Sequence, residues 1–186
     1  AMNRSQGIDR LSNEDAPWDV VVIGGGATGL GSALDAVSRG YRTLLLEAAD
    51  FANGTSSRST KLMHGGVRYL RQGNVSLVRE SLHEREWLLS HVPHQVRPQP
   101  FLIPTFSCWE TWYYRIGLWF YDRLAGKLGI RSTQRFSKQD VLNRIPSMNG
   151  DKLAGGVMYW DSQFDDARLC VQAAQTIWDH GGIALN

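Results

Sequence analysis

A glycine-rich turn between a buried strand and a helix constrains this chain more than any other feature. Residues 19–23 (DVVVI) form an unbroken apolar run, which is typical of a strand covered on both faces of a parallel sheet. Residues 24–29 (GGGATG) follow at once and match G-x-G-x-x-G. Apolar residues then recur at helical spacing from Ala27, and residues 42–46 (RTLLL) predict a second buried strand. The order strand, turn, helix, strand predicts a βαβ unit with a right-handed crossover.

Each glycine of this motif has its own physical reason. Gly24 permits the tight turn, Gly26 lets the backbone approach a diphosphate, and Gly29 lets the helix pack on the strand. The N–H groups at the helix start, with the positive end of the helix dipole, favour a negatively charged ligand. Glu47 ends the second strand, where a carboxylate accepts hydrogen bonds from an adenosine ribose and disfavours a 2′-phosphate. The motif predicts FAD or NAD rather than NADP, and it leaves the choice between FAD and NAD open.

The composition excludes several other classes of protein. The chain has 186 residues with 20 basic and 18 acidic side chains, which is typical of one ordinary soluble globular unit. Its two cysteines, Cys108 and Cys170, show neither disulfide-framework nor zinc-site spacing, so we expect a reducing compartment and no metal. No apolar stretch is long enough to span a membrane. Residues 1–17 resemble no targeting sequence, and we expect them to form a flexible tail.

The rest of the chain is predicted to form a loop followed by helices and strands. Residues 48–66 are rich in small and hydroxyl side chains and predict an ordered loop. Four prolines exclude a helix between residues 93 and 104. Apolar periodicity predicts three helices, at residues 75–90, 112–124 and 166–180, and two strands, at residues 158–160 and 183–185.

Positive charge is concentrated in the middle of the chain. Residues 61–138 carry 12 basic and 5 acidic side chains. Such a block suits an anionic ligand, an anionic membrane surface or nucleic acid, and it also suits a plain solvated face. Within it, residues 109–130 mix aromatic and basic side chains, as an interfacial helix does, although core packing explains the aromatic residues equally well. No recognised nucleic-acid-binding module surrounds this segment, so we expect no nucleic-acid partner.

Two longer strings resemble the N-terminal part of FAD-dependent glycerol-3-phosphate dehydrogenases. They are VVVIGGGATGLGSALDAVSRG at residues 20–40 and GTSSRSTKLMHGGVRYL at residues 54–70. LHEREWLLSHVPH at residues 82–94 and DDARL at residues 165–169 continue the likeness in the same order. The resemblance spans nearly the whole chain from Trp18. It implies an α/β fold, namely a Rossmann-like FAD-binding domain of the glutathione-reductase type, with a parallel sheet and flanking helices, interleaved with part of a substrate domain.

The resemblance also implies a division of the chain. After the tail at residues 1–17, residues 18–90 are expected to form the first part of the FAD-binding domain. Residues 91–164 are then expected to belong to the substrate or cap domain. Residues 165–186 are expected to return to the FAD-binding domain, which is truncated.

Site residues follow from the same likeness, each with a structural alternative. His64 is expected beside the flavin as the catalytic candidate, where it tunes the flavin or helps to deprotonate the substrate hydroxyl, and Arg68 and Tyr69 are expected to bind the substrate phosphate. The structural alternatives are a hydrogen-bonded histidine for His64, a surface ion pair for Arg68, and a surface turn rich in Ser and Thr for the hydroxyl residues of the loop. The residues expected to bind FAD are Gly24, Gly25, Gly26, Ala27, Thr28, Gly29, Glu47, Thr55, Ser56, Ser57, Lys61, Leu62 and His64.

The implied reaction is oxidation of glycerol 3-phosphate to dihydroxyacetone phosphate, with electrons passed to a quinone. The family implies a homodimer in the full-length enzyme and a cytoplasmic, peripheral position on an anionic membrane surface, the inner face of a bacterial plasma membrane. Oxygen remains open as the electron acceptor, and the sequence does not identify the general base. Two alternatives stay open: a catalytically inert nucleotide-binding fragment, and an NAD-linked Rossmann dehydrogenase.

Overall fold

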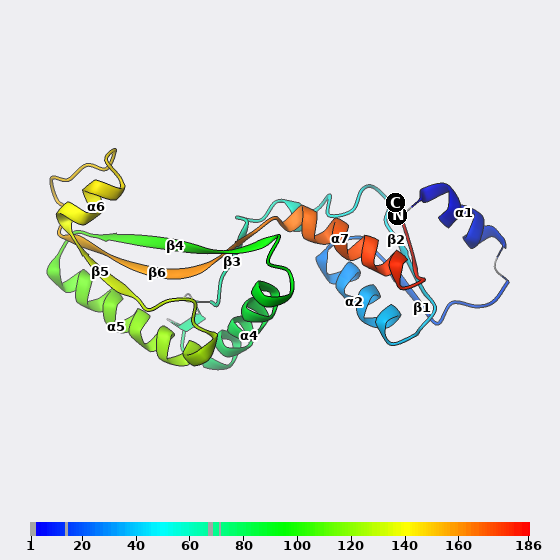
Figure 1. The fold of residues 1–186 in the computed structure, drawn as a ribbon, viewed down its shortest axis with the longest axis horizontal. Coiled ribbons are helices and arrows are strands. Elements are labelled where there is room, and N and C mark those ends of the chain that lie inside the picture. The colour runs from blue at the N-terminus through cyan, green and yellow to red at the C-terminus, as the bar shows by residue number, and fades with distance from the viewer. Residues whose placement is uncertain (1–2, 14, 67–68, 71) are drawn as a thin grey trace. The chain divides into compact units, whose positions relative to one another are not determined.

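A computed structural model describes residues 3–13, 15–66, 69–70 and 72–186, which form two compact units (Figure 1). The first unit comprises the chain up to Lys61 together with Asp165–Asn186, and the second comprises Leu62–Phe164. The first boundary therefore lies after Lys61 and differs from the expected one after residue 90. The reason is the helix at 75–91, which packs against elements of the second unit.

A parallel three-stranded sheet in the order β1-β2-β7 forms the centre of the first unit. Its strands are β1 (Val20–Ile23), β2 (Thr43–Leu46) and β7 (Ile183–Leu185). Helix α2 (Ala27–Ser38) connects β1 to β2, which confirms the predicted βαβ unit. Strand β7 adds to β2, although most of the chain lies between them.

Helices cover one face of this sheet and part of the other. The expectation that β1 is covered on both faces is wrong, because Val21 and Ile23 are 53% and 89% exposed. Helix α7 (Asp166–Asp179) packs beside α2, and together they cover the face that carries Leu45 and Ala184. The opposite face carries Leu44 and Ile183 and packs against Leu11 of α1 (Arg4–Asn13). The residues buried between α2, α7 and the sheet are Leu30, Ala33, Val37, Leu45, Phe51, Ala52, Cys170, Ala174, Ile177 and Ala184.

The expected flexible tail is wrong for residues 4–13, because these residues form α1 and pack on the sheet. Gly7 is buried in contact distance of Trp178 and Leu185, where a Cβ would lie 2.7 Å and 2.8 Å from their side-chain atoms. The segment has few apolar residues, and its helix is stabilised by tertiary contacts rather than by an apolar stripe of its own.

An antiparallel four-stranded sheet forms the second unit. Strand β6 (Gly155–Phe164) pairs with β3 (Leu62–Met63), β4 (Val96–Thr105) and β5 (Gln134–Ser137). Figure 1 shows α4 (Val75–His91) and α5 (Cys108–Ala125) along one face of this sheet. The remaining elements are the short 3-10 helix η2 (Gly126–Leu128) and α6 (Lys138–Arg144).

Strand β4 was not predicted, because its prolines interrupt the strand pattern in the sequence. Pro98, Pro100 and Pro104 exclude a helix, as expected, but they lie in a ten-residue strand paired to β6 along its whole length. A proline lacks the N–H of a sheet bond and is tolerated in an edge strand. Among the described residues β4 pairs with β6 alone, so each proline can turn its nitrogen away from the partner strand.

Short polar side chains fix the starts of several helices. The Asn74 side chain accepts the Leu77 N–H at the start of α4, and Ser107 accepts the Glu110 N–H at the start of α5. Asp165 caps α7 by accepting the Arg168 N–H. Each such cap satisfies an N–H that has no partner within the helix. None of the helices in the described part of the chain is long and apolar enough to cross a bilayer.

Candidate functional site

The glycine turn has the geometry that the motif requires. Gly24 has a φ of +111°, a conformation that favours glycine. An added Cβ at Gly29 would lie 2.0 Å from the carbonyl oxygen of Gly24, so α2 can approach β1 only because residue 29 has no side chain. The first N–H groups of a helix have no carbonyl partner in the preceding turn, so side-chain oxygens or an anionic ligand can accept them.

Glu47 binds the glycine turn directly. One carboxylate oxygen accepts the Gly25 N–H at 2.6 Å, and the other accepts the Ala49 N–H at 2.9 Å. These backbone hydrogen bonds lower the pKa of Glu47 below its ordinary value, so the side chain is a carboxylate. Each oxygen has a second lone pair, which leaves capacity for a ribose hydroxyl. The acid predicted to bind a ribose thus also orients the turn beside it.

The hydroxyl-rich loop folds back onto the start of α2. Thr55–Ser57 form the short 3-10 helix η1, and the Ser56 hydroxyl accepts the Ala27 N–H at 2.9 Å. Ser56 therefore lies at the first amide of the helix, where the motif predicts a diphosphate. Thr28 is exposed on the first turn of α2. The structure thus brings the predicted glycines, Glu47 and Ser56 together in the first unit, with Thr55 and Ser57 beside Ser56 in η1.

Lys61 ends this loop in an ion pair that the sequence analysis missed. Its ammonium binds the carboxylate of Asp166, the first residue of α7, and also donates to the Ser57 carbonyl at 2.7 Å. The Ser59 hydroxyl donates to the same carboxylate at 2.6 Å. Lys61 has a φ of +59°, which is unfavourable for a side chain with a Cβ, and these contacts hold it there. The predicted role of Lys61 at a cofactor therefore competes with a structural role.

Because Asp166 makes these contacts as a carboxylate, we expect the free energy of unfolding to fall in acid. Burial raises the pKa of Asp166, but hydrogen bonds from Lys61, Ser59 and Ala167 outweigh it and lower the pKa from 3.8 to about 2. The unfolded state therefore binds the proton more readily, so the stabilisation is present above about pH 4 and is lost as the pH falls through about 2.

Denaturant unfolding of the wild type and of Asp166→Asn, repeated between about pH 6 and about pH 2, measures this effect. The wild type should be the more stable at the upper end, and the difference should shrink toward the lower end. A difference that stays constant across the range would contradict the assignment.

The remaining predicted residues lie in or next to the second unit's first segment. Leu62 is half-buried in β3, His64 is exposed, and the two following glycines are buried. Tyr69 packs against the cluster formed by α4 and α5. Arg68, predicted to bind the substrate phosphate, lies outside the described residues.

Comparison with known proteins decides between the two cofactors that the motif left open. The model of a family described as FAD-dependent oxidoreductases matches residues 19–186. This chain belongs to that family. Its cofactor class is therefore FAD, and the NAD-linked alternative is wrong.

The relatives of this flavoprotein chain include several glycerol-3-phosphate dehydrogenases. The mitochondrial enzyme of Rattus norvegicus is 46% identical over 176 residues, which cover 91% of this chain and 24% of that protein. Glycerol-3-phosphate dehydrogenase 2 of Mycobacterium bovis is 46% identical over 94% of this chain and 30% of its own length. The chain thus spans 24–30% of the length of these curated relatives.

A solved structure supports the same assignment of fold. The crystal structure of the glycerol-3-phosphate dehydrogenase from Bacillus halodurans, complexed with FAD, superposes with a TM-score of 0.70. It is 33% identical and covers 98% of this chain and 28% of that one. The predicted fold class, a parallel sheet with flanking helices interleaved with a second domain, is confirmed.

A buried polar network in the second unit of this flavoprotein chain was not predicted. Arg85 of α4 donates to the Asp161 carboxylate of β6 at 2.9 Å and to the Leu128 carbonyl at 2.7 Å. The same guanidinium donates to the Tyr121 hydroxyl of α5 at 3.2 Å. Asp161 in turn accepts the Gly65 N–H with both oxygens, at 3.1 Å and 3.2 Å. We call Arg85, Tyr121 and Asp161 the buried triad.

One signal in the sequence points to this triad. Val78, Leu82, Arg85 and Leu89 have the spacing of a single helix face, so Arg85 interrupts an otherwise apolar stripe. An arginine on the buried face of a helix needs an acidic or carbonyl partner, because an unpaired buried charge is strongly unfavourable. The stripe therefore predicts a buried partner for Arg85 but cannot identify it.

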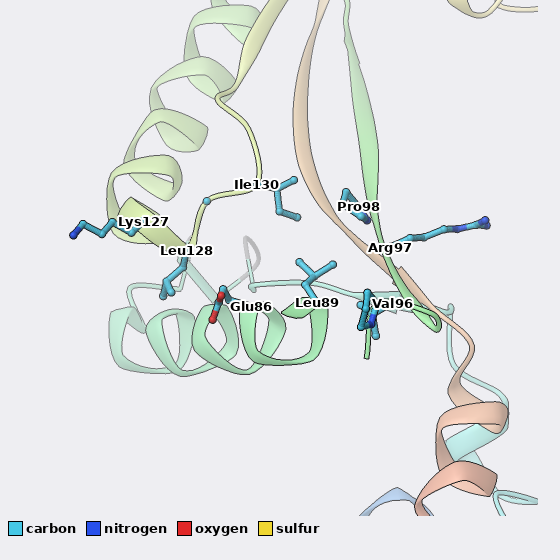
Figure 2. A pocket seen from close by; sticks show the side chains of 10 residues that line it. Glu86, Leu89, Val96, Arg97, Pro98, Lys127, Leu128 and Ile130 are labelled. Atoms are coloured by element: carbon cyan, nitrogen blue, oxygen red, sulfur yellow. The ribbon is translucent and has the colours of Figure 1, made fainter. Parts of the chain in front are cut away.

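The second unit also contains an apolar hollow of about 390 Å³ (Figure 2). Leu89 and Ile130 point into the space between α4, β4 and the segment after η2, whereas Arg97 and Lys127 point away from it. Of the residues predicted to bind FAD or substrate, none that the structure describes lines it. The lining residues are Glu86, Leu89, Pro93, Val96, Arg97, Pro98, Lys127, Leu128, Gly129 and Ile130.

Proposed function

We propose that this chain is the FAD-binding portion of a glycerol-3-phosphate dehydrogenase, which oxidises glycerol 3-phosphate to dihydroxyacetone phosphate. The observation that carries the proposal is the identity of 33–46% with enzymes of that name over at least 91% of the chain. The matched family model covers residues 19–186, which include the strings at residues 20–40 and 54–70 and all of the predicted cofactor residues.

The glycine turn is the part of the chain that fits the diphosphate of FAD best. The Gly29 position leaves no room for a Cβ. At Gly26, a Cβ would meet the Ser56 hydroxyl at 3.1 Å and no other neighbour within 4 Å in the described part of the chain. The donors at the start of α2 are backbone N–H groups and small hydroxyls, which suit phosphate oxygens, while Glu47 suits a ribose. When bound, FAD would supply the group that accepts a hydride from the substrate carbon.

The substrate contacts are proposed for the segment after Lys61. An arginine side chain forks onto two phosphate oxygens and a phenol adds a third bond, so Arg68 and Tyr69 suit the phosphate of glycerol 3-phosphate. The His64 imidazole is proposed to hold or remove the proton of the substrate hydroxyl. In this proposal residues 18–61 and 165–186 belong to the FAD-binding domain, and the second unit belongs to the substrate domain.

Quinone, a membrane surface and a homodimer are further parts of the proposal. Aromatic side chains on α5 support attachment to an anionic membrane, because Trp109 is 78% exposed and Trp112 is 52% exposed. The Arg115 guanidinium lies 5.0 Å from the ring centre of Trp112, so cation and aromatic group share one face. Such a face suits the headgroup layer of the cytoplasmic leaflet of a bacterial plasma membrane.

Flavin retention and bleaching by substrate together test the proposed function. We expect the purified chain to take up FAD with a 1:1 stoichiometry, measured by absorbance and by quenching of flavin fluorescence. Under exclusion of oxygen, glycerol 3-phosphate should bleach the bound flavin, whereas glycerol, which lacks the phosphate, should not at the same concentration.

The two readouts separate the remaining alternatives. A chain that takes up FAD but is not bleached by glycerol 3-phosphate would support the inert nucleotide-binding fragment. A chain that binds no FAD would contradict the role proposed for the glycine turn.

A further inference from the structure

We propose that the buried triad is a positioning device, in which Asp161, held by Arg85, fixes the main chain at Gly65 and thereby the orientation of His64. The proposal rests on the proposed function for its catalytic consequence. Its structural part concerns only the second unit and holds for the chain with or without a cofactor.

The contacts of Asp161 converge on one backbone amide. Both carboxylate oxygens accept the Gly65 N–H, and one of them also accepts an Arg85 N–H. Gly65 belongs to no helix or strand. A loop amide that is removed from water needs an acceptor, and here a carboxylate from a strand 96 residues further along the chain supplies it.

Steric contact also restricts Gly65. An added Cβ at Gly65 would lie 2.1 Å from the Tyr121 hydroxyl oxygen and 2.5 Å from a methyl carbon of Leu82. The loop is therefore pressed against α4 and α5 and bonded to β6 at the same residue. His64 comes immediately before this point and is exposed, so the backbone that carries it is fixed while its imidazole remains accessible.

Stability alone does not explain the triad. The side chains of Arg85 and Asp161 are 1% and 2% exposed, and the Arg85 Nε is buried without a hydrogen-bond partner among the described residues. Burial raises the pKa of Asp161 above its ordinary value, although Arg85, Gly65 and His64 act in the opposite direction. A buried ion pair of this kind is often no more stabilising than apolar residues of similar volume. Its specific effect is to fix the groups that it binds.

Two double variants of the same pair test the proposal. Arg85→Met with Asp161→Leu removes both the charges and the acceptor for Gly65. Arg85→Met with Asp161→Asn also removes both charges but keeps a side-chain oxygen that can accept the Gly65 N–H. Neither variant leaves a buried unpaired charge, so both are expected to fold.

Backbone hydrogen exchange at Gly65 is the primary measurement. We expect the Gly65 amide to exchange roughly 100-fold faster in the leucine variant than in the wild type, and the asparagine variant to recover most of the protection. Equal exchange in the two variants would overturn the proposal. In the wild type alone, exchange of Gly65 as fast as that of an exposed turn glycine such as Gly54 would also overturn it, so a variant that fails to fold does not remove the test.

Flavin reduction by glycerol 3-phosphate is the second measurement. Its rate should fall roughly 100-fold in the leucine variant and recover in the asparagine variant, because a displaced His64 no longer meets the substrate hydroxyl. A role in packing alone would affect both variants alike. The exchange measurement needs no cofactor, so a chain that binds no FAD contradicts the proposed function and leaves the positioning proposal to be judged on Gly65.

Discussion

Replacing Gly29 by alanine should reduce the affinity for FAD at least ~100-fold, because the added Cβ would lie 2.0 Å from the Gly24 carbonyl oxygen. That oxygen belongs to the backbone of the glycine turn and cannot rotate away as a side chain can. Either α2 or the turn must move, and both carry the N–H groups proposed to bind the diphosphate. Titration with FAD, followed by flavin fluorescence, measures the loss.

Gly31→Ala is the matched control for Gly29→Ala. Gly31 lies two residues further along α2, and an added Cβ there meets no atom within 4 Å. Alanine favours a helix over glycine by about 0.5–1 kcal/mol, so this variant should bind FAD as the wild type does and unfold at a slightly higher temperature. Similar affinities for Gly29→Ala and Gly31→Ala would show that the close contact of helix and turn does not serve FAD binding.

Removing Asp161 alone should cost about 3–5 kcal/mol in the free energy of unfolding. Asp161→Ala leaves the Arg85 guanidinium buried, and its remaining partners among the described residues are the Tyr121 hydroxyl and the Leu128 carbonyl. An uncompensated buried charge is costlier than the loss of the ion pair itself. Unfolding in urea or guanidinium chloride, monitored by far-UV circular dichroism, gives the difference in free energy.

Asp35→Ala provides the comparison for this loss. Asp35 forms an ion pair with Arg39 one turn further along α2, and both side chains are more than half exposed. A solvated pair of this kind contributes little to the free energy of unfolding. If Asp161→Ala cost no more than Asp35→Ala, Arg85 would have to find water or another partner, and the buried triad would not have the role proposed for it.

Local features of the sequence predicted the first unit well. The strand at β1, the glycine turn, α2 and β2 follow one another within about thirty residues, so each signal lies beside the next. Glu47 was predictable for the same reason, since its position depends only on the lengths of one helix and one strand. Its hydrogen bond to Gly25 was not, because the motif specifies where an acid lies and not which backbone group it meets.

Sequence patterns could not predict which distant residues pair with one another. Arg85 and Asp161 lie 76 residues apart, and nothing near either residue indicates the other. Strand β4 is similar, because its prolines hide the strand pattern and its partner residues in β6 lie 50 to 68 positions further along the chain. Asp166 was predicted only as the first residue of a helix. Its contact with Lys61 was not predictable, because more than a hundred residues separate the two in the sequence.

The interrupted first unit has a consequence for synthesis on the ribosome. Strand β7 pairs with β2, yet residues 62–164 emerge from the ribosome between the two strands. The second unit is continuous in sequence and can assemble as soon as it has left the exit tunnel, whereas β1 and β2 must wait with one edge of β2 uncovered. During translation the free edge of β2 can therefore pair wrongly with another strand. Pairing with β7, which follows α7, covers this edge.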